Sequence, residues 1–185
     1  MKLAILAGIS AFAIASGGIS EAGAAVIDVG PSGFQVQETA RIAAPPDRVY
    51  AALIKPGEWW NPEHSYSHDA GNMTLSATAG GCWCEKWSGG SVVHMTVVFA
   101  APGKTLRLTG ALGPLQALGV AGTMTWTLTP SVDGGTVVTL DYAVGGYSPD
   151  GFTRWASAVD GVLAEQMGRL QLYVQTGSPT AVATH

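Results

Sequence analysis

Polar and apolar residues alternate along much of the chain, which is typical of strands with one buried face. Residues 34–42 alternate in this way, and in residues 123–129 Met124, Trp126 and Leu128 share one face. Composition and glycine-containing turns predict six strands after the first one, over residues 73–78, 81–87, 92–101, 105–110, 122–130 and 135–145. The fifth of these contains the alternating segment 123–129. Because no helical segment lies between these six strands, the sequence predicts an antiparallel meander rather than a parallel sheet.

One long amphipathic helix is predicted after the strands. Apolar residues recur at spacings of three and four from Phe152 to Val174, and residues 177–179 (Gly-Ser-Pro) end the segment. Ser148 and Pro149 are the expected N-cap and first helical residue. Two short helices are predicted after the first strand. The expected fold is therefore α+β, with a strongly curved antiparallel sheet of about seven strands wrapped around the C-terminal helix and a pocket left at one end.

Two glycines lie inside the predicted long helix. Gly161 and Gly168 are seven residues apart, and so on one helical face. Each costs about 1 kcal/mol relative to alanine in a helix interior. Their presence suggests that the sheet backbone or a ligand approaches this face closely, and close packing against the sheet is the simpler expectation.

The N-terminal segment is expected to be an export signal. Lys2 precedes an apolar run over residues 3–16, and an Ala-x-Ala pattern ends at Ala24. The run is shorter than the roughly 20 residues that span a bilayer, so no stable membrane anchor is expected after cleavage. The predicted organisation is a signal peptide over 1–24, a domain over 25–177 that opens with a short leader, and a disordered tail over 178–185. It predicts a periplasmic or secreted protein.

Composition narrows the classes of partner. Of the 185 residues, 47% are hydrophobic and 12% are charged, and the formal net charge is -4. Nucleic-acid binding and polybasic membrane-surface binding both require basic clusters, which this sequence lacks. The expected partner is an apolar small molecule, and the sequence does not indicate an oligomeric state.

Two cysteines, Cys82 and Cys84, lie on one face of a predicted strand. Their Cα atoms would be roughly 6.5–7 Å apart in an extended strand, near the upper limit for a disulfide. A bridge would need a locally bent backbone. We therefore expect two free, partly buried thiols.

Three sequence segments together resemble the SRPBCC (START-like, helix-grip) superfamily. They are APPDRVYAAL (44–53) followed by a Trp-Trp pair, GGCWCEKW (80–87), and VVFAAPGKTLRL (97–108). The order and spacing are similar to those of the branch that contains homologues of the heat-shock-protein ATPase activator and polyketide cyclase-like proteins. The resemblance implies a helix-grip fold with a hydrophobic cavity between sheet and helix. It does not imply one function, since members include carriers and cyclases.

Glu85 and His94 are the candidate catalytic residues. Glu85 shares a strand face with Trp83 and Trp87, so it is expected inside, where it could orient a ligand hydroxyl or act as an acid or base. The alternative is an ion pair with Lys or Arg at the sheet edge. His94 could accept or donate protons or hydrogen-bond a ligand carbonyl, although a structural role is the alternative and strand alternation does not decide its face.

Large side chains expected along the pocket are the candidate ligand-binding residues. They are Trp83, Trp87, Trp126, Tyr142, Trp155 and Leu115. For Tyr142 ordinary core packing is the alternative. The loop over residues 111–119 has exposed-looking leucines between Gly110 and Gly119, which suggests a mobile apolar lid; a cluster packed shut over the core is the alternative.

Metal and cofactor sites are not expected. Glu63, His64, His68 and Asp69 form a group with suitable ligand chemistry for zinc, but a solvated loop is the favoured interpretation. The familiar nucleotide-binding and hydrolase motifs do not occur in the sequence.

Three functional hypotheses follow. The first is an exported, non-catalytic binding protein for a lipid, isoprenoid or aromatic compound held between sheet and helix. The second is a cofactor-independent cyclase, dehydratase or isomerase that uses Glu85 and His94. The third is a protein-interaction module that presents the 111–119 loop.

Overall fold

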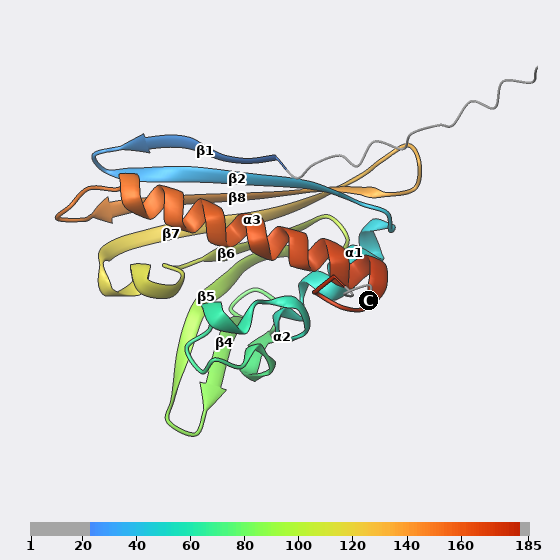
Figure 1. Cartoon of the computed structure of the whole chain (residues 1–185), viewed down its shortest axis with the longest axis horizontal. Coiled ribbons are helices and arrows are strands. Elements are labelled where there is room, and N and C mark those ends of the chain that lie inside the picture. Colours follow the sequence, from blue (N-terminus) through green and yellow to red (C-terminus); the bar gives the residue numbers. More distant parts are fainter. Residues whose placement is uncertain (1–22, 182–185) are drawn as a thin grey trace, which may run out of the picture.

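The structure is a computed structural model that describes residues 23–181 (Figure 1). In this part of the chain eight strands form one antiparallel sheet, in the order β1-β2-β8-β7-β6-β5-β4-β3. The strands are β1 (Gly23–Gly30), β2 (Gly33–Ile42), β3 (Met73–Leu75), β4 (Cys82–Trp87), β5 (Gly90–Ala101), β6 (Thr105–Thr109), β7 (Gly119–Pro130) and β8 (Thr136–Tyr147). The α-helices are α1 (Pro46–Leu53), α2 (Pro56–Trp59) and α3 (Thr153–Thr176), and short 3₁₀ helices are η1 (Pro62–His64), η2 (Ala70–Asn72) and η3 (Gly113–Ala117).

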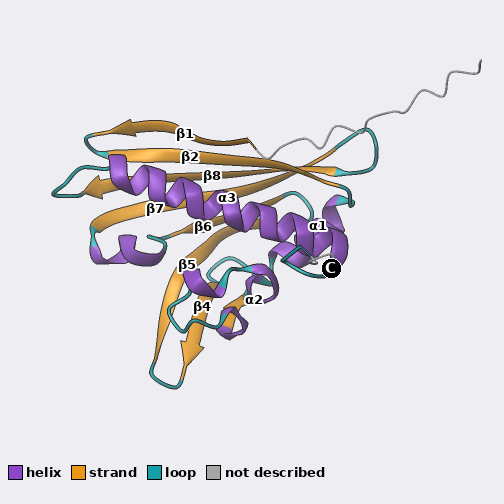
Figure 2. Cartoon of the chain, in the orientation of Figure 1, coloured by secondary structure: helices purple, strands orange, loops and turns teal. Residues whose placement is uncertain are grey.

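The sheet curves around α3, as expected for a long twisted sheet covered by a single long helix. In Figure 2, α3 lies across the strands of one half of the sheet, while the β4–β5 hairpin points away from them. The meander β3 to β8 is confirmed. Its last strand, β8, pairs with β2 over the whole length of β2, from Gly33↔Gly145 to Ile42↔Thr136. Helix-grip architecture is thus the observed fold.

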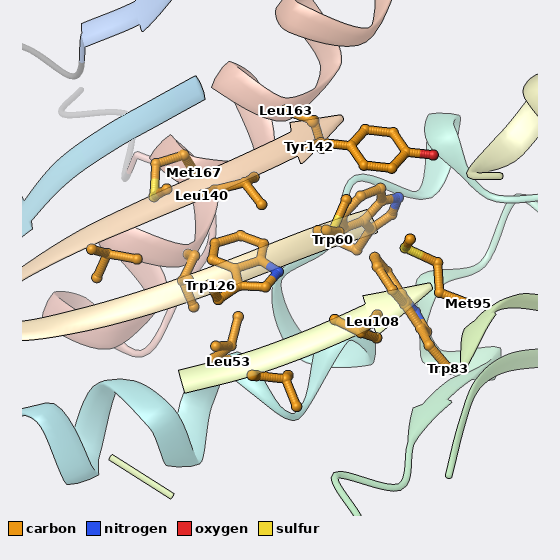
Figure 3. Close-up of a cluster of buried hydrophobic side chains, with 14 of the residues drawn as sticks. Leu53, Trp60, Trp83, Met95, Leu108, Trp126, Leu140, Tyr142, Leu163 and Met167 are labelled. Atoms are coloured by element: carbon orange, nitrogen blue, oxygen red, sulfur yellow. The ribbon is translucent and has the colours of Figure 1, made fainter. Parts of the chain in front are cut away.

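The inner face of β2, β7 and β8 forms a solid core with α1 and α3. Trp126 and Tyr142 are almost completely buried there, and the Trp59 and Trp126 rings meet edge to face with centroids 6.2 Å apart. Figure 3 shows this cluster extending through Leu140 and Met167. A void of only about 10 Å³ remains beside Trp126, where α1 and α2 cover β6 and β7, so this part of the core is close-packed.

The N-terminal leader expected over residues 25–32 is instead mostly the edge strand β1. It pairs antiparallel with β2, from Gly23↔Thr39 to Gly30↔Gly33. Val26, Ile27 and Val29 are exposed, so backbone pairing rather than side-chain burial holds the strand in place. The predicted cleavage after Ala24 falls within this strand, and the predicted signal peptide otherwise lies outside the described residues, as do residues 182–185 of the predicted tail.

The ends of α3 agree only in part with the sequence prediction. Gly177 closes the helix in a left-handed conformation with φ 78°, as expected. The predicted N-cap at Ser148 is wrong, because Gly151 turns the chain with φ 72° and the helix begins at Thr153. Within residues 23–181 no helix is both long and apolar enough to cross a membrane.

The two helical glycines do not mediate close packing. A Cβ atom added at Gly161 or Gly168 would meet no atom within 4 Å apart from its chain neighbours and the backbone of the helix itself. The expectation that they let the helix approach the sheet is therefore wrong, since both face open space.

Candidate functional site

An apolar cavity of about 300 Å³ opens between the N-terminal half of α3 and two connections of the sheet. We call it the His94 cavity, after the single β5 residue in its wall. Its wall comprises Trp155, Ala158, Val159, Val162 and Leu163 of α3, Trp60, Glu63, His64, Ser65 and Tyr66 of the η1 segment, Leu112, Gly113, Pro114 and Leu115 of the η3 segment, and His94. Most of these side chains are aliphatic or aromatic, as in sites for small apolar ligands.

The apolar face of α3 serves two different purposes along its length. Its C-terminal half buries Met167, Leu170 and Val174 in the core. Towards the N-terminus, Trp155, Val159 and Val162 are only half-buried and border the cavity. The helix therefore fills the sheet at one end and leaves space at the other.

A β-bulge directs His94 into the molecule. Trp83 pairs with Met95 and Cys84 pairs with Val93, so His94 is the extra residue of β5. His94 and Met95 are consequently both buried, although they are neighbours in a strand. This is why alternation in the sequence did not decide the face that His94 occupies.

The cysteines opposite the bulge form a disulfide, so the expectation of two free thiols is wrong. Their Cα atoms are 5.4 Å apart, well below the separation in a fully extended strand. The register shift between Trp83 and Cys84 marks the irregularity that brings them together. The bridge and His94 thus lie on opposite strands of one distorted hairpin.

The carboxyl group of Glu85 is the hydrogen-bonding partner of the His94 imidazole. Glu85 Oε2 lies 3.0 Å from His94 Nε2, and both side chains are almost completely buried. The same carboxyl group accepts backbone hydrogen bonds from Ser67 (2.6 Å) and Tyr66 (3.1 Å). Glu85 therefore does not border the cavity, so that expectation is wrong. It contacts His94, which does.

These contacts determine the charge of the pair. Burial tends to raise the pKa of Glu85, but hydrogen bonds from Ser67, Tyr66 and His94 outweigh it and leave the pKa below its ordinary value. Burial lowers the pKa of His94 despite the opposing effect of Glu85. At neutral pH the pair is thus an ionised carboxylate next to a neutral imidazole. A neutral imidazole oriented by a carboxylate can accept a proton from a bound molecule.

Polar side chains of α3 position the η1 segment, which forms one wall of the cavity. Gln166 Oε1 accepts a hydrogen bond from the Asn61 amide at 2.8 Å, and Glu165 contacts His64 Nε2 at 3.1 Å. Arg169 donates to the carbonyl of Trp59. The sequence indicated only a solvated loop here. The main contribution of this loop to the site is the pair of backbone amides that bind Glu85, and backbone groups leave no pattern of side-chain types.

The 111–119 connection is tied to the fold at several points. Leu112 donates from its amide to Tyr142 Oη (3.0 Å), and Tyr66 Oη donates to the carbonyl of Gly113 (3.0 Å). Leu115 is almost completely buried, so its predicted exposure is wrong. It borders the cavity, and a lid-like movement of this connection stays a prediction.

The structure separates the six predicted ligand-binding residues into two groups. Trp155 and Leu115 line the His94 cavity. Trp83, Trp126 and Tyr142 do not, because the straight helix and the α2 segment fill the hollow of the sheet around them (Figure 3). Burial raises the pKa of Tyr142 to about 12, so its hydroxyl stays protonated; it donates to the carbonyl of Gly110 and accepts from the amide of Leu112. Trp87 stacks on Tyr66 at the far end of β4, with ring centroids 6.5 Å apart, and also lies outside the cavity wall.

The other candidate sites have fewer groups that could bind a metal or a ligand. In residues 23–181 no three His, Cys, Asp or Glu side chains gather as a metal site requires, and His64 pairs with Glu165 rather than with its sequence neighbours. Two further hollows, of about 490 and 470 Å³, lie at the surface. Neither has a wall from α3 or an unpaired buried polar group.

Comparisons with known proteins agree with this architecture. Residues 33–175 match the family described as polyketide cyclase / dehydrase and lipid transport. A conserved protein of unknown function from Enterococcus faecalis has a similar structure, with a TM-score of 0.60, 14% identity and coverage of 88% of this chain and 80% of that one. CalU16 from Micromonospora echinospora is also similar (TM-score 0.56, 15% identity, 86% of each chain), and so is DynU16 from the dynemicin biosynthetic locus (TM-score 0.53, 21% identity, 78% of this chain and 48% of that one). No match was found among curated proteins. At these identities the structural likeness shows the fold alone.

Proposed function

The chain belongs to the polyketide cyclase/dehydrase and lipid transport family, and from that premise we propose that it binds a small apolar molecule in the His94 cavity. The family and the observed fold point to a ligand-binding or cyclase role. The observation that carries the proposal is the half-buried apolar face of α3, where Trp155, Val159 and Val162 border open volume. Apolar surface that the fold leaves uncovered in a concave site favours an apolar ligand.

Binding can be tested by filling the cavity. Replacing Val159 with Trp places a large side chain in the wall, and we expect binding of 2-naphthol, measured by calorimetry, to weaken at least tenfold. Leu172→Trp is the matched control, because Leu172 is half-buried on the same helix and does not line the cavity. Equal affinity in the wild type and in Val159→Trp would contradict the proposed binding site.

A second candidate function is acid–base catalysis by the same pair. The supporting observation is the Glu85–His94 contact at 3.0 Å in an otherwise apolar site. A carboxylate that orients a neutral imidazole is a common arrangement for a general base. His94 would take the proton, and Glu85 would position the ring without touching the bound molecule.

A generic base reaction tests this candidate without knowledge of the natural substrate. In 5-nitrobenzisoxazole, removal of the C3 proton by a base breaks the ring N–O bond and yields a coloured cyanophenolate. We expect acceleration by the wild type, loss of roughly 100-fold in His94→Phe, and a smaller loss in Glu85→Gln. Because the pKa of His94 lies below its ordinary value, the rate should be level near neutral pH and fall on acidification. A wild type no faster than His94→Phe would reject catalysis and leave the binding proposal intact.

We also propose that the protein works outside the cytoplasm. The apolar N-terminal run and the Cys82–Cys84 disulfide both support export, because disulfides persist in oxidising compartments. The mass of the mature protein isolated from its own cells tests this proposal. An intact Met1 in a cytoplasmic fraction would contradict it.

A further inference from the structure

The Cys82–Cys84 disulfide faces outward, on the side of β4 opposite the His94 cavity. Trp83 and Glu85, at alternate positions of this strand, are almost completely buried. Cys82 and Cys84 occupy the other positions and are only half-buried. Because successive side chains of a strand point to opposite faces, the two cysteines share the outer face of the sheet. A reagent in solution can approach the bridge from this side.

The surface around the bridge is open, partly apolar and positively charged. The β4–β5 hairpin projects from the rest of the sheet (Figure 1). Val93 of β5 and Thr74 of β3 pair with Cys84 from either side, and both are exposed, Val93 by 54%. Lys86 is exposed on the same strand face, next to Cys84 in the alternation. An uncovered apolar side chain offers a contact to an approaching molecule, and a nearby ammonium group stabilises a cysteine thiolate.

The fold does not depend on this bridge. A disulfide stabilises a protein mainly by restricting its unfolded chain, and this restriction becomes small when the closed loop is short. Here the loop contains only Trp83 between the two cysteines. The Trp83 ring packs against Trp60, with ring centroids 4.9 Å apart, so packing already fixes the strand. Exposed disulfides of this kind are the ones that are readily reduced.

The sheet keeps the two thiols together when the bridge is open. β4 is paired with β3 on one side and with β5 on the other. The Ser76 amide also donates to the carbonyl of Cys82, at 3.1 Å. None of these backbone hydrogen bonds involves a sulfur atom, so the reduced strand stays in the sheet with its thiols on one face. The bridge can therefore form again without refolding of the chain.

We propose that Cys82 and Cys84 form a thiol–disulfide exchange site that oxidises an external dithiol, an activity separate from binding in the His94 cavity. One thiolate of the dithiol attacks Cys82 Sγ, the Cys82–Cys84 bond breaks, and Cys84 leaves as a thiolate near the Lys86 ammonium. The second thiolate of the dithiol then attacks the substrate sulfur of the mixed disulfide. This step forms the substrate disulfide and releases Cys82 as a thiolate. Two electrons pass from the dithiol to the cysteine pair, and the two protons that the dithiol loses are taken up by the cysteine thiolates.

Reduction of the folded and the unfolded protein by dithiothreitol provides the test. The full-length protein reacts with this dithiol at neutral pH, with and without denaturing urea. Iodoacetamide stops the reaction at timed intervals, and mass spectrometry counts the modified cysteines. We expect the native bridge to be reduced at a rate within about threefold of that in the unfolded chain. A native bridge that reacts at least about 100-fold more slowly would be shielded by the fold and would overturn the proposal.

Two matched pairs of variants locate the reaction. Lys86→Gln removes the nearby ammonium and should slow native reduction about 2- to 5-fold, whereas Lys104→Gln, at an exposed lysine of the β5–β6 turn, should not. Val93→Glu places a carboxylate opposite Cys84 and should slow the reaction about 3- to 10-fold. Val98→Glu, exposed further along the same strand, should have little effect. Equal rates in the wild type and all four variants would overturn the assigned step.

Reversal and independence complete the experiment. After removal of dithiothreitol, oxidised glutathione should restore the bridge in the native protein, and a lasting mixed disulfide with glutathione would overturn the exchange site. Calorimetry with 2-naphthol on the same wild-type sample separates this activity from the proposed function. A reducible bridge in a protein that does not bind 2-naphthol would support the exchange site and count against the binding proposal. A shielded bridge in a protein that binds 2-naphthol would overturn the exchange site alone.

Discussion

The two halves of the sheet solve the packing of α3 in opposite ways. Over β2, β7 and β8 the helix meets alternating apolar residues, and its own Leu163, Met167 and Leu170 are completely buried there. Over the bulged β4–β5 hairpin, the sheet turns away and about 300 Å³ remains open. One regular helix thus supports both a solid core and a cavity, and the difference lies in the strands.

The contrast extends to the polar groups that each half buries. The open half contains Glu85, whose charge is compensated by two amides and His94. The solid half contains Glu38, which is also completely buried but has no hydrogen-bond partner on either carboxyl oxygen. Only the first arrangement presents an oriented polar group to a cavity. The comparison teaches that burial of a carboxyl group alone does not mark the site.

The largest expected effect is on stability, and it distinguishes residues of the solid core from residues of the cavity wall. Trp126→Ala should lower the free energy of unfolding by about 3–5 kcal/mol, because it empties a close-packed position. Trp155→Ala removes a half-buried side chain and should cost only about 1 kcal/mol, while weakening 2-naphthol binding about tenfold. Urea unfolding and calorimetry on both variants check these values. A Trp126→Ala protein that is fully stable would contradict the description of a solid half.

A second prediction concerns the acidic group of the solid half. Burial, with a further contribution from Asp160, raises the pKa of Glu38 from 4.5 to about 8. Between about pH 4.5 and about pH 8 the unfolded chain loses a proton that the folded chain keeps, so stability falls across this range. Glu38→Gln should remove the fall and raise the free energy of unfolding near pH 8.5 by about 2–4 kcal/mol.

Urea unfolding at low and high pH measures this effect. Glu58→Gln is the control, because Glu58 is exposed on α2. A pH dependence of stability that is the same in Glu38→Gln and in the wild type would show that Glu38 does not keep its proton.

A third prediction examines the hairpin of the open half. Replacing both Cys82 and Cys84 with Ser should cost about 1–2 kcal/mol of stability, the small value expected for a short disulfide loop. Because the bridge lies opposite the bulge that directs His94, the rate of the 5-nitrobenzisoxazole reaction should also decrease. Reduction of the wild-type protein with dithiothreitol should have the same effect. An unchanged rate in both experiments would show that the bridge does not determine the position of His94.

Most of the fold could be predicted from the sequence, because its signals are local. Alternation in residues 34–42 and 123–129 defines the inner faces of β2 and β7, and three- and four-residue spacing defines α3. The resemblance to the polyketide cyclase-like branch is confirmed by the family match, whereas the likeness to the ATPase-activator homologues stays a prediction. The edge strand β1 was missed because exposed apolar residues carry no alternation.

The site could be predicted only in part. Glu85 and His94 were identified as a pair by their chemistry, and they do contact each other. Their geometry depends on a one-residue bulge and on two amides of the η1–η2 segment, neither of which leaves a mark in side-chain type. The same reason explains the tryptophans: Trp83 and Trp126 are large and apolar wherever they lie, and only the path of α3 decides which large residues border open space.

The smallest expected effect compares the two halves along α3 itself. Gly161 and Gly168 each face open space, so alanine at either position fits without displacing a neighbour. Each substitution should raise the free energy of unfolding by about 0.5–1 kcal/mol through helix propensity. Gly161 is close in the chain to the cavity-lining residues Val159 and Val162, whereas Gly168 is next to Met167 of the solid core. Equal stabilisation, with 2-naphthol affinity unchanged in both, is expected, because neither glycine borders the cavity. If Gly161→Ala weakened binding and Gly168→Ala did not, Gly161 would be required for ligand binding. The binding site would then include residues of α3 beyond those that line the cavity.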